Sequence, residues 1–71
     1  MTMTEFREAT KPIKAGKRVR AHVRGAHEGS TRWHIGTYQP DSNEPLILRI
    51  FQNGEMFRFP YSRVIGVEEV R

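Results

Sequence analysis

Basic side chains alternate with small apolar ones from residue 17 to residue 24. The basic members after Lys17 are Arg18, Arg20, His22 and Arg24, and the apolar members are Val19, Ala21 and Val23. Successive side chains of a strand point to opposite faces, so this pattern predicts a half-buried strand with a basic outer face. Because guanidinium offers a planar fork of permanently charged donors, such a face suits phosphate oxygens.

The positive charge of the chain is concentrated around this strand. Residues 11–34 contain seven Lys or Arg and one acid, whereas the rest of the chain contains five Lys or Arg and seven acids, and the net charge is +4. Lys14 and Lys17 lie just upstream, and Arg32 and His34 of the next strand extend the same basic surface if the register brings them alongside it. Such asymmetry indicates an anionic partner.

Aromatic residues decide whether a basic face can also stack unpaired bases. Trp33 shares an alternating face with Ile35 and Thr37, so we expect it to be buried. Tyr38 lies on the opposite face of that strand, and we expect it to be exposed beside the basic residues. With the predicted core holding the tryptophan, contact with the phosphate backbone is the favoured mode of binding.

Two functions are compatible with these observations. The first is a small module that binds DNA or RNA through its Arg-rich strand; the candidate residues are Lys14, Lys17, Arg18, Arg20, His22, Arg24, Arg32, His34 and Tyr38. The alternative is a protein-interaction module, such as a small regulator or inhibitor encoded by a phage or mobile element, that binds an acidic partner surface. Arg and aromatic residues dominate both kinds of interface, so composition does not separate them.

Catalytic chemistry has little basis in this sequence. No cysteine is present, and Ser30, Ser42 and Ser62 fall in predicted turns without an adjacent base. The three histidines do not match a zinc-binding spacing, and the segment Gly25–Gly29 lacks the ending of a phosphate-binding P-loop. We therefore expect a protein that is not an enzyme and that needs neither a metal nor a cofactor.

The remaining pattern predicts an all-β fold. After Lys17–Arg24, further strands are predicted at 31–39, 46–51, 55–59 and 64–70. Asn53-Gly54 predicts a tight type I′ hairpin turn, and residues 60–63 a single 3₁₀ turn. Gly36 interrupts its strand and indicates a bulge or a close backbone approach. Residues 1–15 are expected to form a flexible or short helical N-terminal arm, and residues 16–71 the folded domain.

This order of strands, loops and turns resembles the SH3-like and Sm-like small β-barrels over about residues 16–70. The segments that carry the resemblance are Gly16–Arg20, Trp33–Tyr38 and Phe59–Ile65. It implies a five-stranded barrel, but such barrels have many functions. Two of these segments are also similar to plasmid-type dihydrofolate reductases, whose active-site Val-Gln-Ile-Tyr motif is replaced here by Met56-Phe57-Arg58-Phe59, so no catalytic residue is assigned.

The cellular setting follows from what the sequence lacks. No apolar stretch approaches the length of a membrane span, and the first residues do not form a signal peptide, so we expect a cytoplasmic protein without membrane contact. A domain of 71 residues has a small core. Self-association through strand edges is therefore a further expectation.

Overall fold

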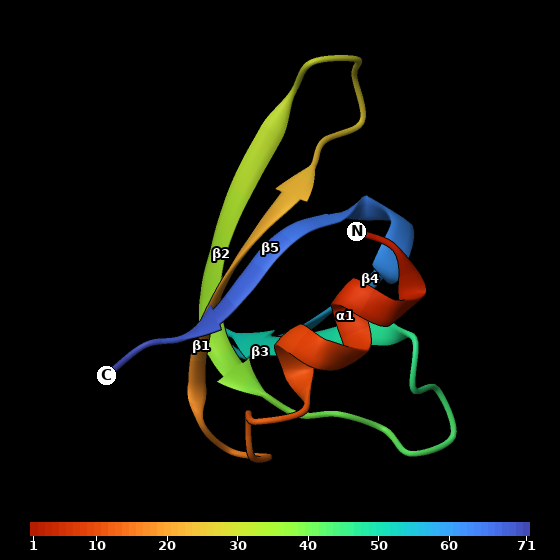
Figure 1. Ribbon diagram of the computed structural model, residues 1–71. Helices are drawn as coiled ribbons and strands as arrows, with labels where there is room; N and C mark the ends of the chain where they lie inside the picture. Colours follow the sequence, from red (N-terminus) through yellow and green to blue (C-terminus); the bar gives the residue numbers. More distant parts are fainter.

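Five antiparallel strands form one sheet, preceded by a short helix, in the computed structural model, which describes all 71 residues (Figure 1). The elements in chain order are α1 (Met3–Thr10), β1 (Arg18–Arg24), β2 (Thr31–Tyr38), β3 (Ile47–Gln52), β4 (Glu55–Pro60), the 3₁₀ turn η1 (Tyr61–Arg63) and β5 (Val64–Glu69). The predicted all-β class is confirmed, and the short helix is the form that the N-terminal arm takes.

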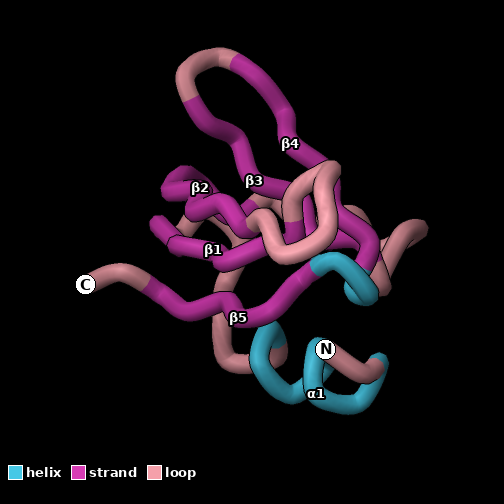
Figure 2. Tube along the Cα trace, turned by 90° about the horizontal axis from the view of Figure 1, so that it is seen from above, coloured by secondary structure: helices cyan, strands magenta, loops and turns pink.

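The strand order is β4-β3-β2-β1-β5, and the two edge strands do not pair with each other, so the sheet is not closed. β1 pairs with β2 along its whole length, but β2 pairs with β3 at only two positions, Thr37 with Phe51 and Tyr38 with Ile50. The β3–β4 hairpin consequently projects from the rest of the sheet, whereas α1 lies beside β5 (Figure 2).

Local turn signals account for the connections. Asn53 and Gly54 have φ angles of 51° and 81°, the positive values that a type I′ turn requires, and they join β3 to β4. The single 3₁₀ turn lies at the predicted position, directly before β5. A Cβ atom on Gly36 would lie 2.4 Å from the carbonyl oxygen of Phe51. The predicted close backbone approach is therefore confirmed, and it lies where β2 meets β3.

The core lies on one side of the sheet and under the helix. It consists of Phe6, Ile13, Val19, Ala21, Val23, Tyr38, Leu48, Ile50, Phe59 and Val64. Thr2 caps α1: its hydroxyl accepts a hydrogen bond from the N–H of Glu5, and the Glu5 carboxylate accepts one from the N–H of Thr2. The capped helix places Phe6, which is only 1% exposed, in the core. No helix in the structure has the length and apolar character needed to cross a bilayer.

Candidate nucleic-acid interface

The outer face of β1 is basic, as its alternation predicts. Val19, Ala21 and Val23 are fully buried, while the side chains between them point away from the core. Arg18, Arg20 and Arg24 are exposed, and His22 is half-buried. Lys14 and Lys17, which precede the strand, are exposed as well.

Trp33 lies on this same outer face, and the prediction that it is buried is wrong. The register pairs Trp33 with His22 across β1 and β2. Its indole ring is parallel to the imidazole of His22, with ring centroids 4.3 Å apart, and the guanidinium carbon of Arg20 lies 5.5 Å from the indole centroid. Trp33 nevertheless remains 59% exposed. An indole held by two neighbours and open to solvent is a preformed stacking surface.

One of the arginines on this face has an acidic partner. The guanidinium of Arg20 forms an ion pair with the carboxylate of Glu68, its register partner on β5. The backbone carbonyl of Arg24 accepts a hydrogen bond of 2.8 Å from the Arg63 guanidinium, which places another cation near this end of the strand. Arg18 and Arg24 have no carboxylate within ion-pairing distance. Most of the positive charge is therefore available to an anionic ligand.

Apolar side chains continue the outer face toward β3. Ile35 pairs with Arg20, and it is 42% exposed. Farther along β2, Thr37 pairs with Arg18 on one side and with Phe51 on the other. Phe51 is 40% exposed. The outer face thus consists of arginines on β1 beside an exposed apolar row on β2 and β3.

Arg32 and His34 do not extend the basic face, contrary to the prediction. They pair with Val23 and Ala21, whose side chains are buried, so both lie on the opposite side of the sheet. There they line an open groove of about 550 Å³ between β2 and the β3–β4 hairpin. The groove exists because residues 31–36 of β2 have no strand partner on the side that faces β3.

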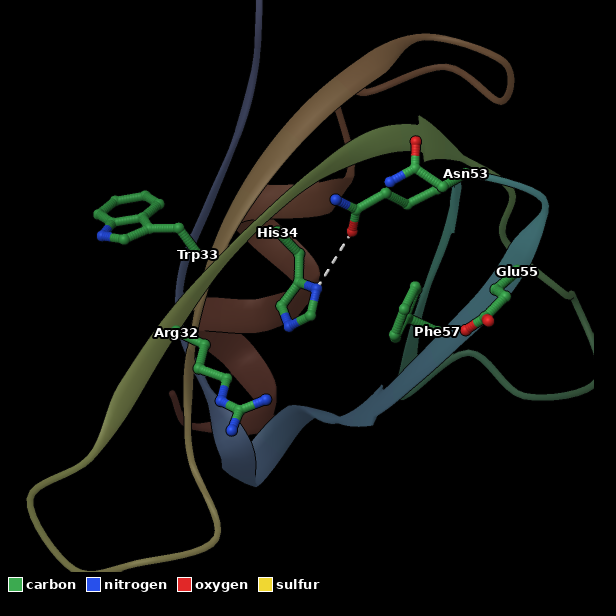
Figure 3. Close-up of a pocket in the computed structure, with 7 residues that line it drawn as sticks. Arg32, Trp33, His34, Asn53, Glu55 and Phe57 are labelled. Carbon is green, nitrogen blue, oxygen red and sulfur yellow. Dashed lines mark hydrogen bonds between the residues drawn. The ribbon is translucent and has the colours of Figure 1, made fainter.

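Polar side chains line the groove around one aromatic ring, that of Phe57 (Figure 3). Nδ1 of His34 donates a hydrogen bond of 3.3 Å to Oε1 of Gln52. The imidazole also contacts the ring of Phe57, with centroids 5.0 Å apart. Asn53 and Glu55 of the hairpin turn complete the lining, whereas the Trp33 ring points away from the groove.

Tyr38 is in the core, and the prediction of an exposed stacking ring at this position is wrong. It is 8% exposed. Its backbone carbonyl accepts a hydrogen bond of 2.7 Å from the N–H of Gly16, and its own N–H donates one of 2.8 Å to the carbonyl of Lys17. Burial raises the pKa of the Tyr38 phenol above its ordinary value, partly offset by the Thr10 hydroxyl. A tyrosine packed in this way supports the fold and leaves stacking to Trp33.

The three wrong predictions for β2, on Trp33, on Arg32 with His34 and on Tyr38, have one cause: the two faces of this strand are exchanged. The alternation of β2 groups its side chains correctly, with Trp33 and Ile35 on one face and His34 and Tyr38 on the other, but the face toward the core is the second one. Gly36 belongs to that second face, and its lack of a side chain is what allows the backbone of β3 to approach. Sequence reasoning does not find Gln52 and Glu55 at all, since only the separation of β2 from β3 places them opposite His34.

No three of the His, Asp and Glu side chains gather in an arrangement that would hold a metal ion. Comparison of the chain with known protein families, with curated proteins and with solved structures found no match.

Proposed function

We propose that the protein binds single-stranded nucleic acid on the outer face of β1 and β2. The observation that carries this proposal is the exposed indole of Trp33, held by His22 and Arg20 within a row of arginines. Sites for single strands combine a cationic surface along the backbone with aromatic rings on which bases stack. Base faces within a duplex are covered by the neighbouring pairs, and unstacking them costs a few kcal/mol, so an indole that projects from a sheet stacks more readily on an unpaired base.

Base stacking and phosphate contact contribute to affinity in ways that can be measured separately. Stacking of one base on an aromatic ring contributes about 1–3 kcal/mol. Each phosphate contact releases counterions, and for single strands the logarithm of affinity falls with the logarithm of salt concentration by about 0.7 per contact. Phosphate contacts from Arg18, Arg20 and Arg24 together therefore predict a slope of about −2. Arg20 must exchange or share its ion pair with Glu68 to take part.

Fluorescence offers a direct test, because Trp33 is the only tryptophan in the chain. Addition of single-stranded DNA or RNA should quench its emission, and a duplex of equal length should quench it less. Trp33→Phe should retain most of the affinity measured by anisotropy, whereas Trp33→Leu, which keeps apolar bulk without a ring, should lose about 5-fold or more. Equal affinity of the two variants would refute stacking.

A matched pair of variants tests the contribution of phosphate contacts to binding. Arg18→Gln should weaken binding and make the salt slope shallower by about 0.7. Arg7→Gln removes the same charge from an exposed position on α1, and it should leave both quantities unchanged. If the two variants behave alike, only the net charge matters, and the proposed face is incorrect.

A protein partner is the second candidate, and the exposed Ile35 and Phe51 favour it. Neither side chain is needed for phosphate contact, and apolar residues surrounded by arginines are typical of protein interfaces. Such a partner would present an acidic rim. Affinity capture that recovers one protein in stoichiometric amount after nuclease treatment, together with unchanged Trp33 fluorescence on addition of oligonucleotides, would favour this function over the first.

We also propose that the fold is an open variant of the SH3-like small barrel. The support is the order of its parts, with the loop 25–30 after β1, the tight β3–β4 hairpin and the 3₁₀ turn before β5. β4 and β5 are the edge strands of the sheet; α1 lies beside β5, so copies of the chain would associate through β4. Sedimentation showing a monomer at high protein concentration would remove self-association from the proposal.

A further inference from the structure

The groove between β2 and the β3–β4 hairpin has the dimensions and the chemistry of a site for one small polar ligand. Sites for small molecules enclose about 300–1,000 Å³, and this groove measures about 550 Å³. A few polar groups around an apolar wall give such sites their specificity. Here the half-buried ring of Phe57 forms the wall, and the polar groups come from both sides of the opening (Figure 3).

The hydrogen bond between His34 and Gln52 determines which groups remain available. Oε1 of Gln52 can only accept, so it takes its hydrogen bond from Nδ1 of His34. The amide nitrogen of Gln52 has no partner within the protein and is left as a donor. Glu55, exposed on the other side of the hairpin turn, adds a carboxylate acceptor. The groove therefore offers acceptors next to a donor.

This combination matches the edge of a base that presents an amino group next to a ring nitrogen. The amino group donates to the Glu55 carboxylate, and the ring nitrogen accepts from the Gln52 amide. Cytosine and adenine have such an edge. Uracil and thymine present a carbonyl oxygen in place of the amino group. That oxygen would face the Glu55 carboxylate, and two acceptors cannot form a hydrogen bond with each other. Arg32, at the same opening, is placed to contact the phosphate of the bound nucleotide.

We propose that the groove binds one unpaired cytosine or adenine of the strand whose neighbouring base stacks on Trp33. This inference rests on the proposed function, and it adds a preference among bases to it. Trp33 and His34 are adjacent on β2 and point to opposite sides of the strand, and Trp33 borders the groove as well. The edge of β2 at residues 31–36 is unpaired, so a bound strand can cross it from the outer face into the groove.

A single-base substitution tests the preference without a change in stacking area. The probe is an oligo(dU) strand, compared with the same strand carrying one dC at each position in turn. One well-paired base edge contributes about 5-fold to 100-fold in discrimination, so at least one dC position should bind about 5-fold tighter than dU. Gln52→Ala and Glu55→Gln should each bring that ratio close to one.

Matched controls are available for both variants. Gln39→Ala and Glu44→Gln change the same residue types at exposed positions outside the groove, and they should keep the wild-type ratio. Equal binding of dC and dU by the wild-type protein, with Trp33 still quenched, would overturn the groove assignment and leave the proposed function standing. Absence of binding to every oligonucleotide would overturn both.

Discussion

Replacement of Gly36 by alanine is the most incisive test of how the sheet is held together. A Cβ at this position would lie 2.4 Å from the Phe51 carbonyl oxygen and 2.7 Å from Cγ2 of Ile50, both closer than real Cβ contacts. Only two residue pairs join β2 to β3, and they lie directly beyond Gly36. Relief of the contact therefore requires the two strands to move apart where they meet.

The expected loss can be set against the stability of the whole domain. Overpacking of a well-packed site costs about 1–3 kcal/mol, and more where backbone must move. A core of this size supplies only about 3–5 kcal/mol of net stability. In a domain of 60–100 residues each kcal/mol corresponds to about 4–8 °C in Tm. We therefore expect Gly36→Ala to lower the melting temperature by about 10 °C or more.

Gly66 provides the matched control. It also lies in a strand and has no positive φ, and a Cβ there would meet nothing within 4 Å. Alanine at such a position restricts the unfolded chain and stabilises by about 0.4–1 kcal/mol. Melting followed by circular dichroism should place Gly66→Ala at or slightly above the wild type and Gly36→Ala far below it. Equal melting temperatures for the two variants would show that β3 does not approach β2 as described.

Four further predictions concern the core, the turn and the titratable groups. Phe6→Ala should abolish the cooperative melting transition. Truncation of a buried phenylalanine costs about 3–5 kcal/mol, which equals the net stability expected of a domain of this size. Asn53→Val should lower the denaturant midpoint, because a β-branched residue is strained at a φ of 51°, whereas Asn53→Gly should not. Because the pKa of Tyr38 is raised in the folded state, its contribution to stability is fully present below the pKa of the unfolded phenol and is lost as pH rises through the pKa of the folded one. Denaturant midpoints measured over a range of alkaline pH should therefore fall for the wild type, and Tyr38→Phe should remove the part of that fall that is due to this phenol. Hydrogen bonds from Thr2, the backbone N–H first, hold the pKa of Glu5 below its ordinary value of 4.5. The stabilisation from these hydrogen bonds is present above the unfolded pKa of Glu5 and is lost as pH falls through the folded pKa. Thr2→Ala removes the hydroxyl but keeps the backbone N–H, so an NMR titration should show the Glu5 pKa rising only part of the way to its ordinary value.

Local patterns are sufficient to predict most of the elements. The alternation around Val19 and Arg20 determines both the strand and its faces, because one side of β1 is packed on the core and the other is open. Asn53-Gly54 determines a tight turn through backbone conformation alone. These features depend on residues close together in the chain, so the local sequence is enough to predict them.

The candidate site can be predicted only in part, because it depends on the pairing of distant strands. Alternation along β2 separates two faces but does not say which of them meets the core. Large apolar residues are usually buried, which favours a core position for Trp33, yet register places it outside with His22. The groove has no local signal at all, since it arises where β2 and β3 fail to pair.

The short junction of β2 with β3 also has a mechanical consequence. Two paired positions make a narrow hinge, and on either side of it the ladders β1–β2 and β3–β4 are continuous. Bending at the hinge would disturb fewer backbone hydrogen bonds than bending within either ladder, so we expect the angle between the two halves to vary more easily than the shape of each half. The groove lies between the two halves, so its width would follow this angle. The hydrogen bond between His34 and Gln52 already links the two halves across the groove, and a ligand held by both strands would strengthen that link.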